Sequence, residues 1–367
     1  MSQPSNGAIL QLRRLLDFLV RAREIVLRRE VTYVEEAMRI ATASLLLAMA
    51  LLLGAAAGPL PAAAQTFTEF TLPTPGSRPS AITLGPDNAL WFTEFGKIGR
   101  ITTQGSITEF PVKGGGIFHS ITTGPDGALW FTEFTLNKIG RIPTTATTEN
   151  LQLIEFTIPG APGPLGITTG PDGALWFTEG AGGKIGRITT TGVVAAFPIP
   201  TAKGGEITTA QDGAMWFTYA RGKIGRITTA GLVTEFAIPP ENSSAGAITS
   251  GPDGALWLTE PVSGKIVRIA TDGKITELAL PNPNAQPWGI TTGPDGALWF
   301  TEASCVREQS SRCIVGNKIG RITTAGAVTE FTIPSDGSGP HSITTGPDGA
   351  LWFTEYYGNR VGRLVLP

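Results

Sequence analysis

Short apolar segments recur along the chain from about Gln65 to Pro367, and residues typical of tight turns separate them. A representative stretch runs from Ile290 to Glu302 and reads I-T-T-G-P-D-G-A-L-W-F-T-E. Its second half is apolar at successive positions, which is typical of a strand buried on both faces. The G-P-D-G step predicts a tight turn, because aspartate can bond the backbone two residues on and glycine accepts a positive φ. The segments K-I-G-R-I-T and I-T-E-F-x-I-P follow, so each unit predicts four short strands.

This unit occurs seven times. One tryptophan marks each copy, at successive spacings of 39, 46, 40, 41, 42 and 53 residues: Trp91, Trp130, Trp176, Trp216, Trp257, Trp299 and Trp352. The period matches a four-stranded propeller blade. Phe67–Pro73 has the pattern of a fourth strand alone, and Arg360–Val365 that of a third strand with no fourth. We therefore predict an all-β fold, a seven-bladed β-propeller of four-stranded blades, whose ring is closed by the N-terminal strand completing the last blade.

The first 64 residues differ in composition from the rest. Ile40–Ala57 is an apolar run, and Ala62 and Ala64 are small residues that suit signal peptidase. Met38 precedes the run and would make a conventional start. We predict that residues 1–64 are an N-terminal extension and signal peptide cleaved after Ala64, and that residues 65–367 are an exported, monomeric propeller, periplasmic or extracellular. The alternative is an uncleaved anchor, since 18 apolar residues are just enough to span a bilayer; either way, membrane contact is expected only through this segment.

Charge excludes one class of partner. The chain has 28 Lys and Arg against 30 Asp and Glu, a formal net charge of −2, and only 16% charged residues. No block of basic residues occurs after the first 40 positions. Nucleic acid is therefore not expected to bind.

Two cysteines, Cys305 and Cys313, lie in one stretch between strands. In an exported protein this spacing predicts a local disulfide. A metal-binding pair is the poorer alternative, because no histidine lies near them in the sequence.

Nearly constant repeats make their exceptions informative. The position two before the first-strand isoleucine varies among the copies: Ser80, His119, Leu165, Gly205, Gly246, Trp288 and His341. It is expected in the loop that enters each blade, beside the mouth of the central channel. The chain has two histidines, and both occupy this position. We interpret them as candidates for binding or catalysis; the alternative is a pair of polar loop residues bonded to backbone or water.

Two further exceptions belong to the same face. Glu206 occupies the next position, which is small in the other copies; it is a candidate metal ligand or general base, or else a surface residue that has drifted. Trp288 is the one tryptophan outside the repeat. It would stack on a ligand or pack under the long loop from Ala303 to Asn317, which we expect to wall a binding cleft.

The repeated polar residues are interpreted as framework. A glutamate ends the second strand in six copies, and a lysine begins the next framework strand in five of these, which predicts ion pairs at the rim worth about 0–1 kcal/mol each. One aspartate in each copy is expected to hold the G-P-D-G turn. The glycine of K-I-G-R-I-T is expected to let a tryptophan ring or another backbone approach closely.

The repeat as a whole resembles the virginiamycin B lyase family. The resemblance rests on the I-T-x-G-P-D-G-A-L-W-F-T-E, K-I-G-R-I-T and I-T-E-F-x-I-P segments, as in Ile290–Glu302 and Lys318–Pro334, and covers about 300 residues. It implies an enzyme that opens the ester of cyclic streptogramin B antibiotics by elimination with Mg²⁺. In that family a histidine takes the α proton, and the metal ion stabilises the enolate-like charge that develops.

The resemblance also assigns residues. The family's base lies in an acidic-Pro-His-Gly sequence; here Gly339-Pro340-His341-Ser342 keeps the histidine and has glycine at the acidic position. Trp288 stands where the family has a second histidine. A family glutamate after the second strand of the last blade corresponds, with a shift of one residue, to Glu355, which precedes Tyr356.

The sequence therefore predicts one site with three sets of residues. The catalytic pair is His341 and Glu355, the Mg²⁺ ligands are Glu206 and Glu355, and the substrate-binding residues are His119, Trp288 and Tyr356. The expected substrate is a small-molecule cyclic ester. The alternative is an exported, non-catalytic propeller that binds a ligand or a protein on the His119/His341 face. Lactonase-type hydrolysis is a weaker third class, because the innermost strands offer mainly isoleucine and threonine.

Overall fold

The computed structural model describes residues 17, 19–21, 23, 65–160, 163–200, 204–219, 222–239, 245–303, 305–307, 313–315 and 317–366. The chain divides into two units, residues 1–64 and 65–367. The described residues of the first unit are helical. Among the described residues, no helix has the length and apolarity needed to cross a membrane. The predicted start at Met38, the apolar run and the cleavage site after Ala64 lie outside the described residues.

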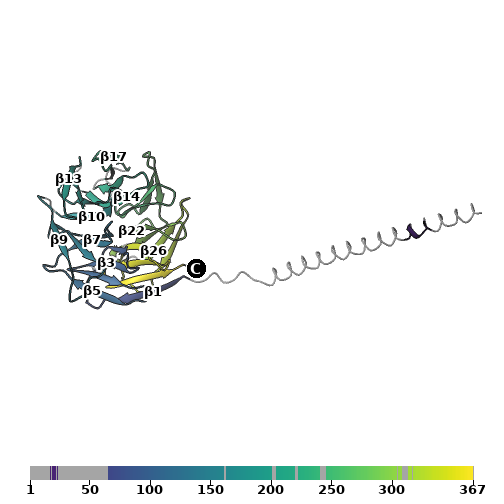
Figure 1. Ribbon diagram of the computed structural model, residues 1–367, viewed down its shortest axis with the longest axis horizontal. Coiled ribbons are helices and arrows are strands. Elements are labelled where there is room, and N and C mark those ends of the chain that lie inside the picture. The colour runs from purple at the N-terminus through teal and green to yellow at the C-terminus, as the bar shows by residue number, and fades with distance from the viewer. Residues whose placement is uncertain are drawn as a thin grey trace, which may run out of the picture. The chain divides into compact units, whose positions relative to one another are not determined.

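The second unit is a ring of seven four-stranded antiparallel sheets (Figure 1). Blade one contains β2 (Ile82–Leu84), β3 (Leu90–Glu94), β4 (Lys97–Ile101) and β5 (Ile107–Pro111). Blade two contains β6 (Phe118–Thr123), β7 (Ala128–Glu133), β8 (Lys138–Pro143) and β9 (Ile154–Thr157). Blade three contains β10 (Pro164–Thr169), β11 (Leu175–Glu179), β12 (Lys184–Ile188) and β13 (Val194–Pro198).

The remaining blades follow the same order. Blade four contains β14 (Gly204–Thr209), β15 (Met215–Tyr219), β16 (Lys223–Ile227) and β17 (Val233–Ala237). Blade five contains β18 (Ile248–Ser250), β19 (Leu256–Glu260), β20 (Lys265–Ile269) and β21 (Ile275–Ala279). Blade six contains β22 (Pro287–Thr292), β23 (Leu298–Glu302), β26 (Lys318–Ile322) and β27 (Val328–Thr332), with the hairpin β24 (Cys305–Arg307) and β25 (Cys313–Val315) between β23 and β26. Blade seven contains β28 (Pro340–Thr345), β29 (Leu351–Glu355), β30 (Arg360–Val365) and β1 (Thr66–Thr71).

The N-terminal strand closes the ring, as the sequence predicts. β1 pairs antiparallel with β30, from Thr66 opposite Val365 to Thr71 opposite Arg360. The Phe70 ring stacks on Trp352 at 5.6 Å between centroids, as the outermost-strand phenylalanine does in other blades. The first strand of the propeller is therefore the outer strand of its last blade, and the predicted seven-bladed fold is confirmed.

One aspartate ties three segments of each blade together. In blade three, Asp172 Oδ1 accepts hydrogen bonds from Trp176 Nε1 at 3.0 Å and from the Ala174 N–H at 3.4 Å. Its Oδ2 accepts from Arg187 Nε at 2.6 Å, and that guanidinium lies 6.0 Å from the Trp176 ring centroid. The predicted turn residue thus also fixes the buried tryptophan and the third strand.

The glycine of the third strand accommodates a phenylalanine ring. A Cβ atom at Gly186 would lie 2.0 Å from Cζ of Phe177 in the neighbouring strand. The prediction of a tryptophan or a backbone at this place is wrong, because the tryptophan stacks instead on the outermost strand. In blade five both residues differ: Leu258 replaces the phenylalanine, and Val267 opposite it replaces the glycine.

The glutamates that end the second strands are buried, and the predicted rim ion pairs with them are wrong. Glu133 is 0% exposed, and Lys138 pairs instead with Glu155 of the outermost strand, at 3.1 Å. Lysines of other blades also pair with a glutamate of the outermost strand, as Lys265 does with Glu277 at 2.6 Å. Burial, and to a smaller extent the neighbouring carboxylate of Glu155, raise the pKa of Glu133 to about 8. The buried glutamates Glu94 and Glu302 also have raised pKa values, about 7 for each.

Substituting Gly186 with alanine tests the packing of ring against glycine. We expect Gly186→Ala to lower the free energy of unfolding by about 1–3 kcal/mol, because the added methyl group displaces the Phe177 ring. The double variant Phe177→Leu with Gly186→Val, which copies blade five, should recover most of that loss. Denaturant unfolding of the three proteins measures both effects; a double variant no more stable than Gly186→Ala would contradict the packing argument.

The buried glutamates predict a pH-dependent stability. Their pKa values are raised in the folded protein, so the folded state holds protons that the unfolded chain releases above about pH 4.5. The stability that these glutamates contribute is therefore fully present below about pH 4.5 and is lost as the pH rises through 7 and 8. We expect Glu133→Gln to reduce the loss of unfolding free energy between pH 6.5 and pH 9 by at least about 1 kcal/mol. The matched control is Glu277→Gln, which removes a half-exposed carboxylate; an equal reduction in both variants would overturn the prediction.

Candidate functional site

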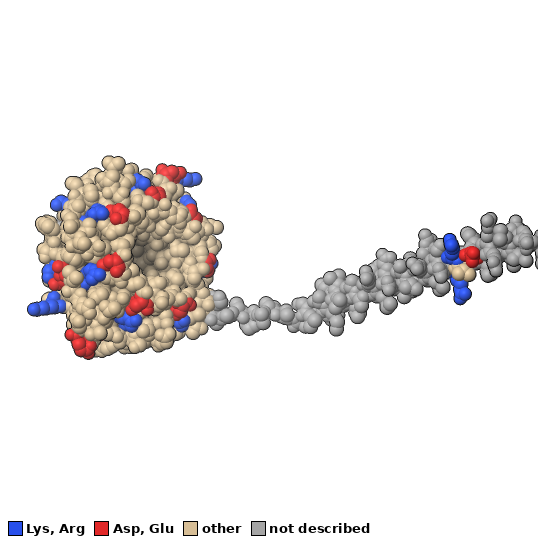
Figure 2. All heavy atoms as spheres, in the orientation of Figure 1, with Lys and Arg blue, Asp and Glu red and all other residues tan. Residues whose placement is uncertain are grey.

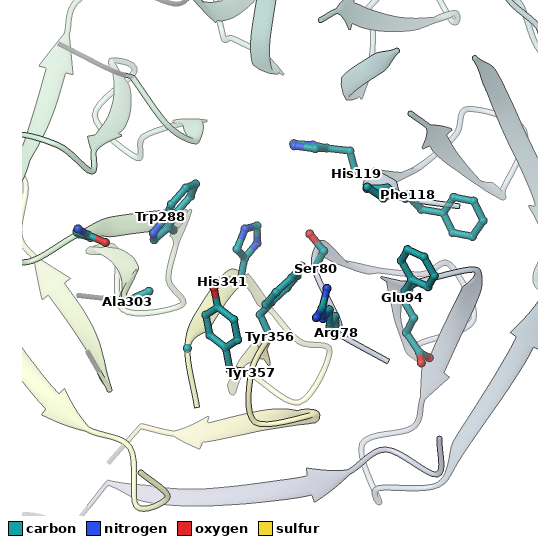
Figure 3. A pocket seen from close by; sticks show the side chains of 14 residues that line it. Arg78, Ser80, Glu94, Phe118, His119, Trp288, Ala303, His341, Tyr356 and Tyr357 are labelled. Atoms are coloured by element: carbon teal, nitrogen blue, oxygen red, sulfur yellow. The ribbon is translucent and has the colours of Figure 1, made fainter. Parts of the chain in front are cut away.

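The variable position that carries both histidines lies in the innermost strand, and its assignment to a loop is wrong for these blades. His119 belongs to β6, whose register shifts between Phe118 and Ile121. His341 belongs to β28, with the same shift between Pro340 and Ile343. Such bulges re-aim the side chains they contain. Both imidazoles consequently project toward the channel mouth from a paired strand (Figure 3).

In each blade, a buried threonine of the second strand accepts a hydrogen bond from the N–H of the residue that follows this position. Thr301 Oγ1 accepts a hydrogen bond from the Gly289 N–H at 2.9 Å in its own blade and donates one to the His341 carbonyl of the next blade at 2.8 Å. Thr218 Oγ1 likewise accepts from the Glu206 N–H at 2.9 Å. The backbone under the candidate residues is therefore held by the repeat and not by the candidate side chains.

A cavity of about 450 Å³ lies at this face (Figure 3). It brings together His119, Trp288, His341 and Tyr356, four of the predicted residues. A second cavity of about 310 Å³, at the channel mouth, shares His119, Trp288 and His341 and adds Glu206. Figure 2 shows a hollow in the middle of the propeller, surrounded mainly by uncharged atoms, with acidic and basic residues side by side farther out.

The cavity has an aromatic wall. The His341 ring stacks on Trp288 at 5.4 Å between centroids and lies 5.8 Å from the ring of Tyr356. Trp288 is 40% exposed, and the exposed side chains of Phe95 and Tyr357 also line the cavity. This wall suits a ligand with apolar or aromatic groups.

The sequence analysis missed Arg78, the one Lys or Arg among the described residues that line the larger cavity. Its guanidinium carbon lies 6.0 Å from the Tyr356 ring centroid. A signal was available: Arg78 is four residues before the first-strand isoleucine, and the equivalent residues Ile117, Gln286 and Gly339 also line the cavity. Comparing copies at that position would have selected it.

The two histidines have opposite electrostatic environments. Burial, and to a smaller extent His119, lower the pKa of His341 to about 4, although Glu206 and the backbone of Ser80 act in the other direction. Burial also opposes the charged form of His119, but contact with Glu206 outweighs it and raises the pKa of His119 above its usual value. At neutral pH, His341 is therefore neutral, whereas His119 holds a proton more readily than a free imidazole does.

Glu206 lies within ion-pair distance of His119. The two atoms in contact are Glu206 Oε1 and His119 Nδ1, 3.2 Å apart, with side chains 29% and 35% exposed. The contact has the length of an ion pair but lacks the geometry of a hydrogen bond. It joins blades two and four across the mouth of the channel.

Glu355 lies away from the residues predicted to act with it. It is 0% exposed, does not line either cavity, and its Oε2 is 3.3 Å from Arg360 Nη1. Burial, and to a smaller extent Glu69, raise the pKa of Glu355 to about 8, although Arg360 acts in the other direction. In this position Glu355 resembles the framework glutamates of the other blades, and its predicted catalytic role stays a prediction.

The described residues do not fit a protein-held Mg²⁺ ion. Among them, no three His, Cys, Asp or Glu side chains lie close enough together to hold a metal. Glu206 is in contact with His119. Gly339 stands where the resemblance places an acidic residue; its φ is +58°, and a Cβ there would lie 2.5 Å from Cδ2 of Tyr357. The tyrosine ring fills the space that a carboxylate side chain would need, so we derive no step through a metal ion.

The long insert of blade six forms the hairpin β24–β25. Its register places Cys305 opposite Val315 and Cys313 opposite Arg307. Both cysteines thus lie on paired strands and not in an open loop, and the disulfide between them stays a prediction. Ala303, at the start of the insert, lines the cavity, as expected of an element beside the cleft.

Known proteins of similar sequence and structure carry a named activity. The model of the virginiamycin B lyase family matches residues 61–205 and 204–366. The chain is 37% identical to selenomethionine-substituted virginiamycin B lyase from Staphylococcus aureus, with a TM-score of 0.74 over 83% of this chain and 100% of that chain. A structure titled as a streptogramin B lyase is 35% identical, with a TM-score of 0.75 over 83% of this chain and 98% of that chain.

Two further matches carry the same enzyme name. A catalytically inactive histidine-to-alanine variant of the Staphylococcus aureus lyase, solved with quinupristin, is 36% identical, with a TM-score of 0.75 over 83% of this chain and 100% of that one. Virginiamycin B lyase from Bacillus licheniformis is 47% identical over 38 residues, which is 10% of this chain and only 13% of that enzyme.

Trp288 offers an optical test of the cavity wall. It is 40% exposed, whereas the seven repeat tryptophans are at most 1% exposed. We expect acrylamide to quench a minor part of the tryptophan fluorescence in the native protein, and Trp288→Phe to abolish most of that quenching. The matched control Trp257→Phe, which removes a buried tryptophan, should leave the quenchable component in place. Strong quenching of the Trp288→Phe protein would contradict the arrangement.

Proposed function

The chain belongs to the virginiamycin B lyase family, and on that basis we propose that it is a carbon–oxygen lyase that opens a cyclic ester of the streptogramin B type by elimination. The observation that carries the proposal is the position of His341. It occupies the family's histidine position and lies in a cavity of about 450 Å³, stacked on one aromatic side chain and close to another. A neutral imidazole in such a place can accept a proton.

The proposed reaction balances without water. His341 removes the proton from a carbon that lies between a carbonyl group and the carbon bearing the ester oxygen. The electron pair of the broken C–H bond forms a carbon–carbon double bond, and the C–O bond breaks with its electrons going to the leaving carboxylate. The ring opens, and the product keeps the mass of the substrate.

The chain's own residues position the substrate in this proposal. Trp288 and Tyr356 flank the base and offer faces for the apolar groups of a cyclic peptide ester. Arg78, over the Tyr356 ring, is placed to attract the carboxylate that forms. The proposed reaction does not use Mg²⁺, because the described carboxylates do not form a site for the ion.

A second candidate is a non-catalytic propeller that binds a ligand on the same face. The low pKa of His341, about 4, favours it, because an imidazole that holds a proton so weakly is a poor base until the substrate changes its surroundings. The aromatic wall would serve binding alone equally well.

We also propose that the protein is exported and acts as a monomer. Export is supported by the apolar run Ile40–Ala57 and the small residues Ala62 and Ala64. The monomer is supported by the closed ring, in which β1 pairs with the outer edge of β30.

Mass spectrometry of a streptogramin B incubated with the full chain tests the reaction. We expect a linear product of unchanged mass, and a decrease of roughly 10²–10⁴-fold in rate for His341→Ala, because the general base is lost. Parallel reactions with Mg²⁺ and with a chelator measure any metal requirement. The matched control is Ser80→Ala, a change at the equivalent position of another blade that keeps the fold.

Each alternative result is distinct. A product heavier by one water would mean hydrolysis and overturn elimination. No product, together with saturable binding to the cavity that is lost in Trp288→Ala, would favour the binding function over the lyase.

A further inference from the structure

The channel mouth holds a second pair of polar side chains that the reaction above leaves unused. Glu206 is specific to blade four, since the other copies have alanine, serine or glycine at this position. Its N–H is bonded to Thr218 Oγ1 at 2.9 Å, and its strand β14 has a register shift between Gly204 and Ile207. The backbone therefore fixes the direction in which this carboxylate leaves the strand.

The Glu206 carboxylate extends from its strand toward His119. Glu206 Oε1 lies 3.2 Å from His119 Nδ1, so the ring nitrogen left for a ligand is Nε2. Figure 3 shows the His119 imidazole extending into the open space opposite His341. Both histidines line both cavities. A substrate bound there would have a histidine on each side.

The two imidazoles also differ in how readily each holds a proton. Contact with the carboxylate favours the charged form of His119, whereas burial and the charge of His119 favour the neutral form of His341. The other titratable or charged groups facing these cavities are Arg78, Glu94, Tyr356 and Tyr357. Of these, Glu94 is 1% exposed, and Figure 3 shows its carboxyl group turned away from the open space.

We propose that His119, oriented by Glu206, is the electrophile of this site and takes the place of a metal ion. The inference rests on the proposed lyase function. As His341 removes the proton, negative charge develops on the oxygen of the neighbouring carbonyl group. The Nε2–H of His119 donates a hydrogen bond to that oxygen, and the Glu206 carboxylate holds the imidazole in its charged, correctly turned form. His119 is then a catalytic residue, and Glu206 is a positioning residue that acts through it.

The presence of two histidines in the chain makes the pairing directly measurable. Ring-proton NMR of the full chain should give two titration curves, which His119→Asn assigns. We expect Glu206→Gln to lower the pKa of His119 clearly, and the control Glu277→Gln, which removes a carboxylate remote from the cavity, to leave it unchanged. An unchanged His119 titration in Glu206→Gln would overturn the pairing whether or not the protein is a lyase.

Kinetics with a streptogramin B test the role of the pair. We expect His119→Asn to lower kcat by about 10²-fold or more, because one oxyanion donor is lost. Glu206→Gln should lower kcat about tenfold with a nearly unchanged KM, and move the alkaline limb of the kcat–pH profile to lower pH. A chelator should leave the wild-type rate unchanged.

The outcomes separate the two proposals. A wild-type chain that turns over, with His119→Asn and Glu206→Gln equally fast, would overturn the role of the pair and leave the lyase function standing. A rate abolished by chelator and restored by Mg²⁺ would overturn the replacement of the metal. A wild-type chain with no activity would overturn the lyase function and with it this role, while the NMR result still decides the pairing.

Discussion

In six of the seven blades, the hydroxyl of the second-strand threonine donates a hydrogen bond to a carbonyl of the following blade, at the rim of the channel. Thr301 accepts a hydrogen bond from its own blade at Gly289 and donates one to the carbonyl of His341 in the following blade. This threonine is 0% exposed in its strand, so an unmade bond would leave a buried polar group unsatisfied. Because the hydroxyl binds only backbone atoms, the side chain at the variable position is free to differ among blades. A repeated framework can therefore carry a site that is not repeated.

Ring closure turns these separate positions into neighbours. Each second strand is buried between two adjacent blades, and β1 completes blade seven through its pairing with β30. His119, Glu206 and His341, which come from blades two, four and seven, thereby meet at one channel mouth. The same constraint explains why Trp288 stacks on His341: β22 and β28 are the innermost strands of adjacent blades, and a Cβ at Gly289 would lie 2.6 Å from the His341 carbonyl oxygen.

The sequence was sufficient for the fold and for the face of the site, because both follow from the phase of the repeat. It was not sufficient to predict which charged side chains pair with one another. Lys138 has glutamates near it on both neighbouring strands, and the sequence alone does not show that Glu133 is desolvated while Glu155 remains accessible for pairing. Nor does sequence separation show that Glu206 reaches His119, since that depends on the bulges and on the width of the channel. Nor does the sequence alone show that Glu355, which ends its strand like the framework glutamates, is buried beside Arg360.

The low pKa of His341, about 4, is compatible with a role as base once the charges of the reaction are included. Burial and the nearby His119 cause the lowering in the free protein. During elimination, negative charge develops on the substrate between the two imidazoles, and an adjacent negative charge favours the protonated form of each. The proton affinity of His341 therefore rises as the proton is transferred, and that of His119 rises with it. Stabilisation of this kind is larger in the transition state than in the ground state, which is the condition for it to accelerate the chemical step.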